Sequence, residues 1–125
     1  MAIKKISAVL LADRIEPCIG FWASLGFEKS MDVPGDSGLA FAILKKDSIE
    51  LMYQTYASVE TEPGGPRNFA KGPTFLYIEV DDLEDAKRSV AGAKVVMPDR
   101  ATFYGSREFG VQDPAGHILT FAQFG

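Results

Sequence analysis

Cysteine and histidine are nearly absent from this sequence of 125 residues, in which Cys18 is the only cysteine and His117 the only histidine. No disulfide can form within the chain, and a reducing, cytoplasmic location is the simplest expectation. A cysteine-rich zinc site is excluded, as is any site that needs two histidines from one chain. Because His117 follows the turn sequence Asp113-Pro114-Ala115-Gly116, we interpret it as a solvated turn residue and not as a general base.

Positive charge and long apolar runs are also scarce. The 13 Lys and Arg residues are outnumbered by 17 Asp and Glu, which gives a formal net charge of -4, whereas binding to nucleic-acid phosphates depends on a surplus of basic residues. The longest apolar stretches, residues 6–12 and 39–44, are far shorter than the ~20 residues that a membrane-spanning helix needs. We therefore expect no nucleic acid and no membrane as a partner.

Short apolar segments at strand spacing make up most of the remaining sequence. One helix is expected from Pro17 to Gly26, and a second from Asp81 or Asp82 to Val90. Trp22 falls at helical spacing within the first helix and is interpreted as a core anchor. Strands are expected at residues 4–12, 27–33, 39–44, 48–54, 73–80, 94–97, 106–112 and 117–124.

The second half of the chain repeats the element order of the first half. Leu51 aligns with Phe121 in the last strand of each half, and Gly26 aligns with Gly92 after each helix. Between the halves lies a Gly- and Pro-containing segment without periodicity. We therefore expect a single domain, residues 1–125, with a first βαβββ module at 1–56, a linker at 57–72 and a second βαβββ module at 73–125.

Short motifs follow one another in a recognisable order. They are Phe21-Trp22 before Leu25-Gly26-Phe27; Ile49-Glu50-Leu51; Ile78-Glu79-Val80-Asp81-Asp82; and Phe103-Tyr104-Gly105-Ser106-Arg107-Glu108 before Asp113-Pro114-Ala115-Gly116-His117. In this order the chain resembles the vicinal oxygen chelate superfamily of glyoxalases, bleomycin-resistance proteins and extradiol dioxygenases. The resemblance covers nearly the whole chain. It implies an α+β fold of two βαβββ modules, which form a curled mixed sheet round a shared cavity, and a homodimer.

The same resemblance bears on metal binding. Metal-dependent members of the superfamily hold their ion with His and Glu side chains on the first and last strands of each module. Alignment through the motifs puts Ser7, Glu50, Phe75 and Thr120 at these positions. Only Glu50 is a good ligand for a divalent ion, so we expect no metal and no cofactor. The site is then closest in character to that of the metal-free bleomycin-resistance branch.

Strand alternation predicts which side chains line the pocket. Glu50 shares its face with Met52, and Phe75 shares its face with Tyr77. Arg107 and Glu108 point to opposite faces of a regular strand, so at most one of them faces the cavity. The predicted ligand-binding residues are Glu50, Met52, Phe75, Tyr77, Tyr104, Arg107, Glu108, Thr120 and Ser7.

Glu50 is the first candidate for a functional carboxylate, and the alternative is a structural ion pair with a Lys or Arg. Burying its charge is costly without compensation. We therefore expect a raised pKa, a cationic ligand, or a polar partner such as Ser7 or Thr120.

Three functions are consistent with the sequence. The first is metal-independent binding or sequestration of a small, partly aromatic organic molecule, a cationic one included, with resistance to a drug or metabolite as one version. The second is a lyase or isomerase of the same superfamily, with Glu50 as base, Tyr104 or Tyr77 as acid, and an atypical metal site that uses Glu79 or Glu108. The third is a non-catalytic partner domain whose interior is filled by its own side chains.

Overall fold

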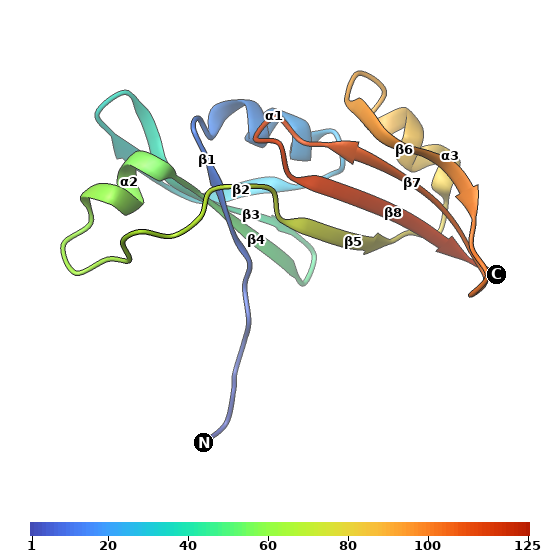
Figure 1. Ribbon diagram of the computed structural model, residues 1–125, viewed down its shortest axis with the longest axis horizontal. Helices are drawn as coiled ribbons and strands as arrows, with labels where there is room; N and C mark the ends of the chain where they lie inside the picture. Colours follow the sequence, from blue (N-terminus) through green and yellow to red (C-terminus); the bar gives the residue numbers. More distant parts are fainter. The chain divides into compact units, whose positions relative to one another are not determined.

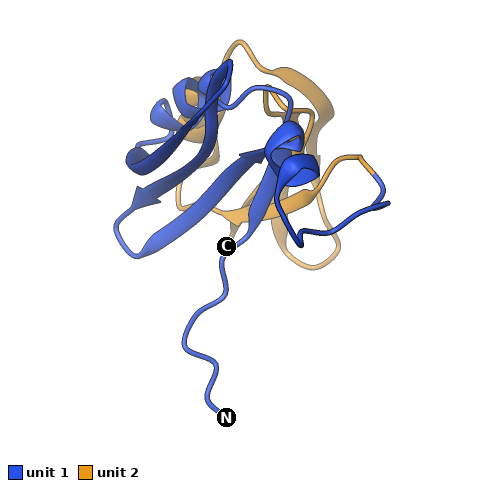
Figure 2. Ribbon diagram, turned by 90° about the vertical axis from the view of Figure 1, so that its left-hand side faces the viewer, with its two compact units in different colours: residues 1–70 blue, residues 71–125 orange.

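The computed structural model describes residues 1–125 and contains two compact units, Met1–Ala70 (unit 1) and Lys71–Gly125 (unit 2), which Figure 2 distinguishes by colour. Each unit contains one βαβββ module with a four-stranded mixed sheet, and in unit 1 a further short helix follows the last strand. The two-module α+β architecture predicted from the sequence is confirmed.

Unit 1 forms its sheet in the order β1-β4-β3-β2, in which β1 runs parallel to β4 and the other neighbours are antiparallel (Figure 1). The first strand is shorter than predicted, because residues 1–8 have no regular structure. The elements are β1 (Val9–Ala12), α1 (Glu16–Ala23), β2 (Glu28–Gly35), β3 (Gly38–Lys46), β4 (Ile49–Thr55) and α2 (Tyr56–Thr61).

The core of unit 1 lies between α1 and one face of its sheet. The Trp22 side chain is buried, and its indole Nε1–H donates a 2.7 Å hydrogen bond to the Tyr53 hydroxyl on β4, which confirms Trp22 as a core anchor. The helix stops three residues before Gly26, whose positive φ of 89° reverses the chain toward β2. The buried side chains of this core include Leu10, Ile15, Cys18, Ala42, Leu44 and Leu51.

The segment predicted as a linker, residues 57–72, is more ordered than its composition suggested. It begins inside α2, where the Thr55 hydroxyl accepts a hydrogen bond from the Ser58 backbone N–H as an N-cap. After this helix, the Arg67 guanidinium donates hydrogen bonds to the backbone carbonyls of Glu62 and Gly65, each 2.9 Å long. One arginine thus holds the loop that follows the helix in a defined conformation.

Unit 2 forms its sheet in the order β5-β8-β7-β6, with the same parallel and antiparallel pattern as unit 1. Asp82 caps its helix by accepting a hydrogen bond from the Asp85 N–H, as one of the two sequence alternatives predicted. The elements are β5 (Phe75–Glu79), α3 (Leu83–Ser89), β6 (Lys94–Ala101), β7 (Ser106–Gln112) and β8 (Ile118–Phe124).

The core of unit 2 lies between α3 and the sheet face formed by Phe109 and Phe121, whose rings stack with centroids 5.2 Å apart. His117 contradicts the sequence interpretation, because it is only 2% exposed instead of solvated. Its Nδ1 accepts a 2.8 Å hydrogen bond from the Thr74 backbone N–H, just before β5. This histidine therefore joins the turn before β8 to the start of the neighbouring strand.

None of the three helices has the length and hydrophobicity needed to cross a bilayer.

Candidate functional site

Each sheet has a face turned away from the main helix of its unit, called here its distal face. In unit 2 this face is built around Glu108, whose side chain is 0% exposed. Its Oε2 accepts hydrogen bonds from the hydroxyls of Tyr77, Tyr104 and Ser106, the last two 2.8 Å long. Its Oε1 accepts a 3.0 Å hydrogen bond from the Arg100 guanidinium. Hydrogen bonds from these side chains thus compensate for the free-energy cost of removing the carboxylate charge from water.

The hydrogen bonds around Glu108 control its protonation. Burial alone would raise the pKa of this carboxyl, but hydrogen bonds from Tyr77, Tyr104, Arg100 and Ser106 outweigh burial and lower the pKa from 4.5 to about 2. The hydrogen bond to Glu108, helped by burial, raises the pKa of Tyr77 to about 12. At neutral pH the site therefore holds an ionised carboxylate beneath a neutral phenol.

Three aromatic side chains of this face remain accessible, and two of them, Tyr77 and Tyr104, contact the carboxylate. Phe75 is 74% exposed, Tyr77 54% and Tyr104 47%. The strand register places Phe75 opposite Ile118 and Tyr77 opposite Thr120, all on the distal face. The distal face of unit 2 therefore combines exposed aromatic rings with an ion pair between the buried Glu108 and the half-exposed Arg100.

In unit 1, Glu50 lies on the distal face of β4, because the alternate residues Leu51 and Tyr53 are buried on the α1 side. The Ser7 hydroxyl donates a 2.8 Å hydrogen bond to Glu50 Oε2. Lys5 Nζ lies 2.6 Å from the same oxygen, and Lys45 Nζ lies 3.7 Å from Oε1. The ion pair with Lys5 and the Ser7 hydrogen bond lower the pKa of Glu50, against the effect of desolvation. From the sequence we expect a raised pKa, a cationic ligand or a polar partner for Glu50. The structure contains a polar partner, Ser7, and the pKa of Glu50 is lowered instead of raised.

Arg107 is separated from the other predicted site residues of unit 2. It follows Ser106 and precedes Glu108, so its side chain lies on the α3 side of β7. There its guanidinium lies 2.6 Å from an Asp99 carboxylate oxygen and 3.6 Å from a Glu84 carboxylate oxygen. The structure places Ser7 and Met52 on the distal face with Glu50, and Phe75, Tyr77, Tyr104 and Thr120 on the distal face with Glu108.

Sequence reasoning missed Arg100 and Ser106. The sequence predicts a strand only at residues 94–97, whereas β6 continues to Ala101 and pairs Arg100 with Glu108. A usable signal was present, since a hairpin that turns at Gly105 brings a basic residue on one strand opposite an acidic residue on the other.

The four positions that hold a metal ion in the metal-dependent members do not provide a metal site here. Glu50 is the only carboxylate among them, and it is occupied by two lysines and the Ser7 hydroxyl. Phe75 has no donor atom, and the hydroxyl of Thr120 is a poor ligand. Nowhere does the structure gather three or more His, Cys, Asp or Glu side chains in a group that could hold a metal ion. The residues present therefore do not fit a catalytic metal.

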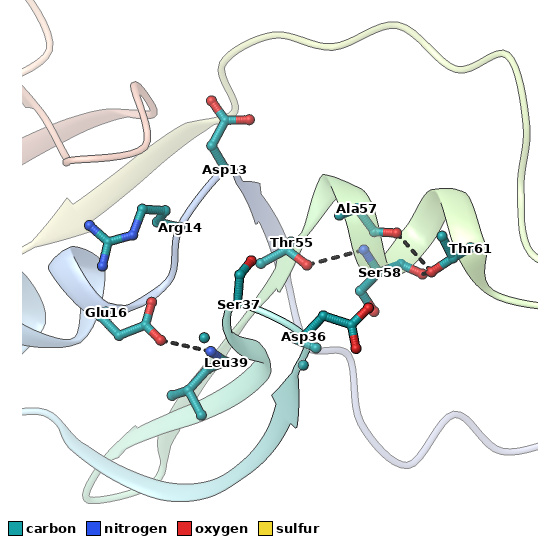
Figure 3. A pocket seen from close by; sticks show the side chains of 13 residues that line it. Asp13, Arg14, Glu16, Asp36, Ser37, Leu39, Thr55, Ala57, Ser58 and Thr61 are labelled. Atoms are coloured by element: carbon teal, nitrogen blue, oxygen red, sulfur yellow. Dashed lines mark hydrogen bonds between the residues drawn. The ribbon is translucent and has the colours of Figure 1, made fainter.

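A separate cavity of about 550 Å³ opens in unit 1 beside the β2–β3 hairpin (Figure 3). It lies between the start of α1, the β2–β3 hairpin and α2, and none of the predicted site residues lines it. The Glu16 carboxylate at its edge accepts a 2.7 Å hydrogen bond from the Leu39 backbone N–H, which lowers the pKa of Glu16. This hydrogen bond holds the β2–β3 hairpin against the start of α1.

The fold has many solved relatives. TioX from Micromonospora sp. ML1 superposes with a TM-score of 0.78 and 18% identity, over 97% of this chain and 98% of that chain. Lactoylglutathione lyase from Agrobacterium tumefaciens superposes with a TM-score of 0.76 and 19% identity, over 98% of this chain and 95% of that chain. An integron cassette protein from the mobile metagenome of V. cholerae superposes with a TM-score of 0.70 and 22% identity, over 100% of this chain and 98% of that chain.

At these identities the superpositions establish the fold alone, and none of the curated proteins matches the chain. The sequence does match the family model of the Glyoxalase/Bleomycin resistance protein/Dioxygenase superfamily over residues 6–121. The two βαβββ units described above have the element order that the sequence resemblance implied. This chain therefore belongs to the glyoxalase/bleomycin resistance protein/dioxygenase superfamily.

Proposed function

We propose that this protein binds a small, partly aromatic organic molecule without using a metal ion, and that it sequesters the molecule instead of transforming it. Sequestration of a drug or a metabolite is one use of such binding. The observation that carries the proposal is the set of exposed aromatic rings on the distal face of unit 2: Tyr77 and Tyr104, which donate hydrogen bonds to the buried Glu108, and Phe75, two residues before Tyr77 on β5. Flat rings held in place by a buried anchor favour stacking of an aromatic ligand.

The two carboxylates support binding over proton abstraction. A general base works best when its pKa lies near the working pH. The pKa of Glu108 is about 2, and ion pairing also lowers the pKa of Glu50. Both are weak bases, which disfavours the lyase or isomerase alternative with Glu50 as base. A cationic ligand would, in addition, have to displace Lys5 from Glu50.

We also propose that the protein is a homodimer. The distal face of the unit 1 sheet carries exposed apolar side chains, including Val9, Met31 and Val33. Exposed apolar surface of this kind favours association with a second copy. Light scattering coupled to size-exclusion chromatography should give twice the chain mass of 13.6 kDa, and a mass of one chain at micromolar concentration would contradict the dimer.

Ligand binding can be tested with 2-naphthalenemethanol, a neutral aromatic probe, by titration calorimetry and amide chemical shifts. We expect shifts at Tyr77 and Thr120 on the distal face of unit 2. Phe75→Ala should weaken binding by a factor of about two to thirteen, the range expected from aromatic contacts of about 0.5–1.5 kcal/mol. Because Phe75 is 74% exposed, this substitution should leave the fold intact.

Val95→Ala is the matched control. Val95 is an exposed apolar residue of the same sheet, but it pairs with the core residue Val111 and therefore lies on the α3 side. Its truncation should leave the affinity for 2-naphthalenemethanol unchanged. The proposal fails if the probe shifts no amide of the distal face, or if the two substitutions weaken binding equally.

A further inference from the structure

We propose that Arg100 selects, among the aromatic molecules that bind the distal face of unit 2, those that carry a carboxylate. This inference rests on the proposed function and adds the chemical class of its ligand. It follows from the way in which the hydrogen-bonding groups around Glu108 are already used.

Glu108 itself is not available to a ligand. Its side chain is 0% exposed, and three hydroxyls and one guanidinium donate hydrogen bonds to its two oxygens. Its negative charge is therefore balanced from within the chain. An incoming cation would find no open position on this carboxylate.

The hydroxyl hydrogens of Tyr77 and Tyr104 are also already used in hydrogen bonds. Tyr77 and Tyr104 donate their hydroxyl hydrogens inward to Glu108, and the raised pKa of Tyr77 keeps its proton in place. Toward the ligand, these residues offer ring surface and an oxygen that can only accept. Neither phenol can therefore donate a hydrogen bond to an anionic ligand.

Arg100 is the positively charged donor beside these rings, where the Thr120 hydroxyl is a neutral one. A guanidinium has five N–H groups, and the Arg100 side chain is 53% exposed although it donates one hydrogen bond to Glu108. Its pairing with Glu108 orients the planar group before a ligand arrives, which lowers the entropic cost of binding. The outer N–H groups suit a carboxylate, because a guanidinium matches its geometry with two parallel hydrogen bonds.

A charge-matched control lies on the same strand. Lys94 pairs with Gln112 at the opposite end of β6, whereas Arg100 pairs with Glu108 near the aromatic rings. The substitutions Lys94→Gln and Arg100→Gln each remove one positive charge from the sheet. A general electrostatic effect would respond to both substitutions, whereas direct selection responds only to the loss of Arg100.

The test compares two probes of the same ring system, 2-naphthoate and 2-naphthalenemethanol, by calorimetry at pH 7. The unchanged protein should bind 2-naphthoate about fivefold more tightly than the alcohol, which corresponds to about 1 kcal/mol, the upper value for an exposed ion pair. Arg100→Gln should abolish this preference, so that the variant binds the two probes with the same affinity. Lys94→Gln should keep the preference.

Loss of Arg100 could disturb Glu108 and the fold, so a second measurement uses the unchanged protein. The Arg100 side-chain Nε–H resonance should shift when 2-naphthoate binds and remain in place when the alcohol binds. The inference is overturned if the unchanged protein binds both probes equally, if Arg100→Gln keeps the preference, or if that resonance does not respond. If neither probe binds, the proposed function itself fails.

Discussion

The indole Nε1–H of Trp22 donates a 2.7 Å hydrogen bond to the hydroxyl of Tyr53, and both side chains are buried. This bond joins α1 to the covered face of β4. Glu50 lies three residues before Tyr53 on the same strand and therefore on its other face. The packing of one aromatic pair thus fixes which face of the strand presents the carboxylate.

Tyr53→Phe should destabilise the protein, because it leaves a buried indole N–H without its acceptor. The expected loss is about 1–3 kcal/mol in the free energy of unfolding, measured by urea denaturation. Ser24→Ala is the control: the Ser24 hydroxyl also makes a hydrogen bond, to the Phe21 carbonyl, but on the exposed surface. Equal losses for the two substitutions would show that burial of the Trp22–Tyr53 bond does not matter.

Much of the fold and part of the site could be predicted because strand alternation is a local property of the sequence. The burial of Leu51 and Tyr53 opposite Glu50 follows from this period of two. The strand predicted from the sequence ends at residue 97, before Arg100, and alternation would not have placed this residue either, because β6 changes register relative to β7 between Val95 and Met97, and again between Met97 and Arg100. Each irregularity interrupts the alternation, so the direction of Arg100 cannot be obtained by counting along the strand.

His117 shows a different limit of sequence reasoning. A histidine after a Pro-Ala-Gly turn is expected in water, but its burial depends on an acceptor for the Thr74 N–H, 43 residues earlier. The partner of this backbone group is set by the parallel pairing of β5 with β8. Nothing in the local sequence around His117 contains that information.

Substitution of Glu50 should distinguish a structural role from a ligand-binding one. Lys5 and Lys45 already pair with its carboxylate, so Glu50→Gln leaves two lysines without their partner. We expect a small decrease in the urea midpoint at pH 7, smaller than that of Tyr53→Phe because both lysines are largely exposed. Binding of 2-naphthoate should not weaken.

Glu28→Gln is the matched control for Glu50→Gln, because Glu28 is an exposed carboxylate of the same sheet with no ion pair. Its urea midpoint should equal that of the unchanged protein. If Glu50→Gln weakens binding of an aromatic probe and leaves stability unchanged, the structural role is refuted.

Acid stability should depend on Glu108. Its pKa is about 2 in the folded protein, below the ordinary value of 4.5. A carboxyl with a depressed pKa stabilises the fold above its ordinary pKa, and this contribution disappears as the pH falls toward the folded value. Between about pH 5 and pH 2 the unchanged protein should therefore lose stability more steeply than Glu108→Gln, as measured by urea midpoints at several pH values.

Glu79→Gln provides the comparison for this pH dependence. Glu79 is exposed on the same sheet, where it pairs with Ala122 and makes no ion pair. Its removal should leave the slope of stability against pH unchanged. Parallel curves for the unchanged protein and Glu108→Gln would mean that the hydrogen bonds to Glu108 do not favour its ionised form.

The stability of the turn before β8 should depend on the acceptor that His117 provides. Its Nδ1 accepts from the Thr74 N–H, and its own backbone N–H donates a 2.8 Å hydrogen bond to Asp113 Oδ1. His117→Phe keeps an aromatic ring but removes the acceptor, so it should cost about 1–3 kcal/mol for the unsatisfied N–H. His117→Asn should recover part of this loss, because an asparagine side-chain oxygen can occupy a position close to that of Nδ1.

Urea denaturation gives the total cost of each His117 substitution, and amide hydrogen exchange at Thr74 identifies the affected bond. Exchange at Thr74 should accelerate in His117→Phe and slow again in His117→Asn. If the two variants lose equal stability and Thr74 exchanges at one rate in both, then packing of the ring, and not the hydrogen bond, holds this end of β5 against β8.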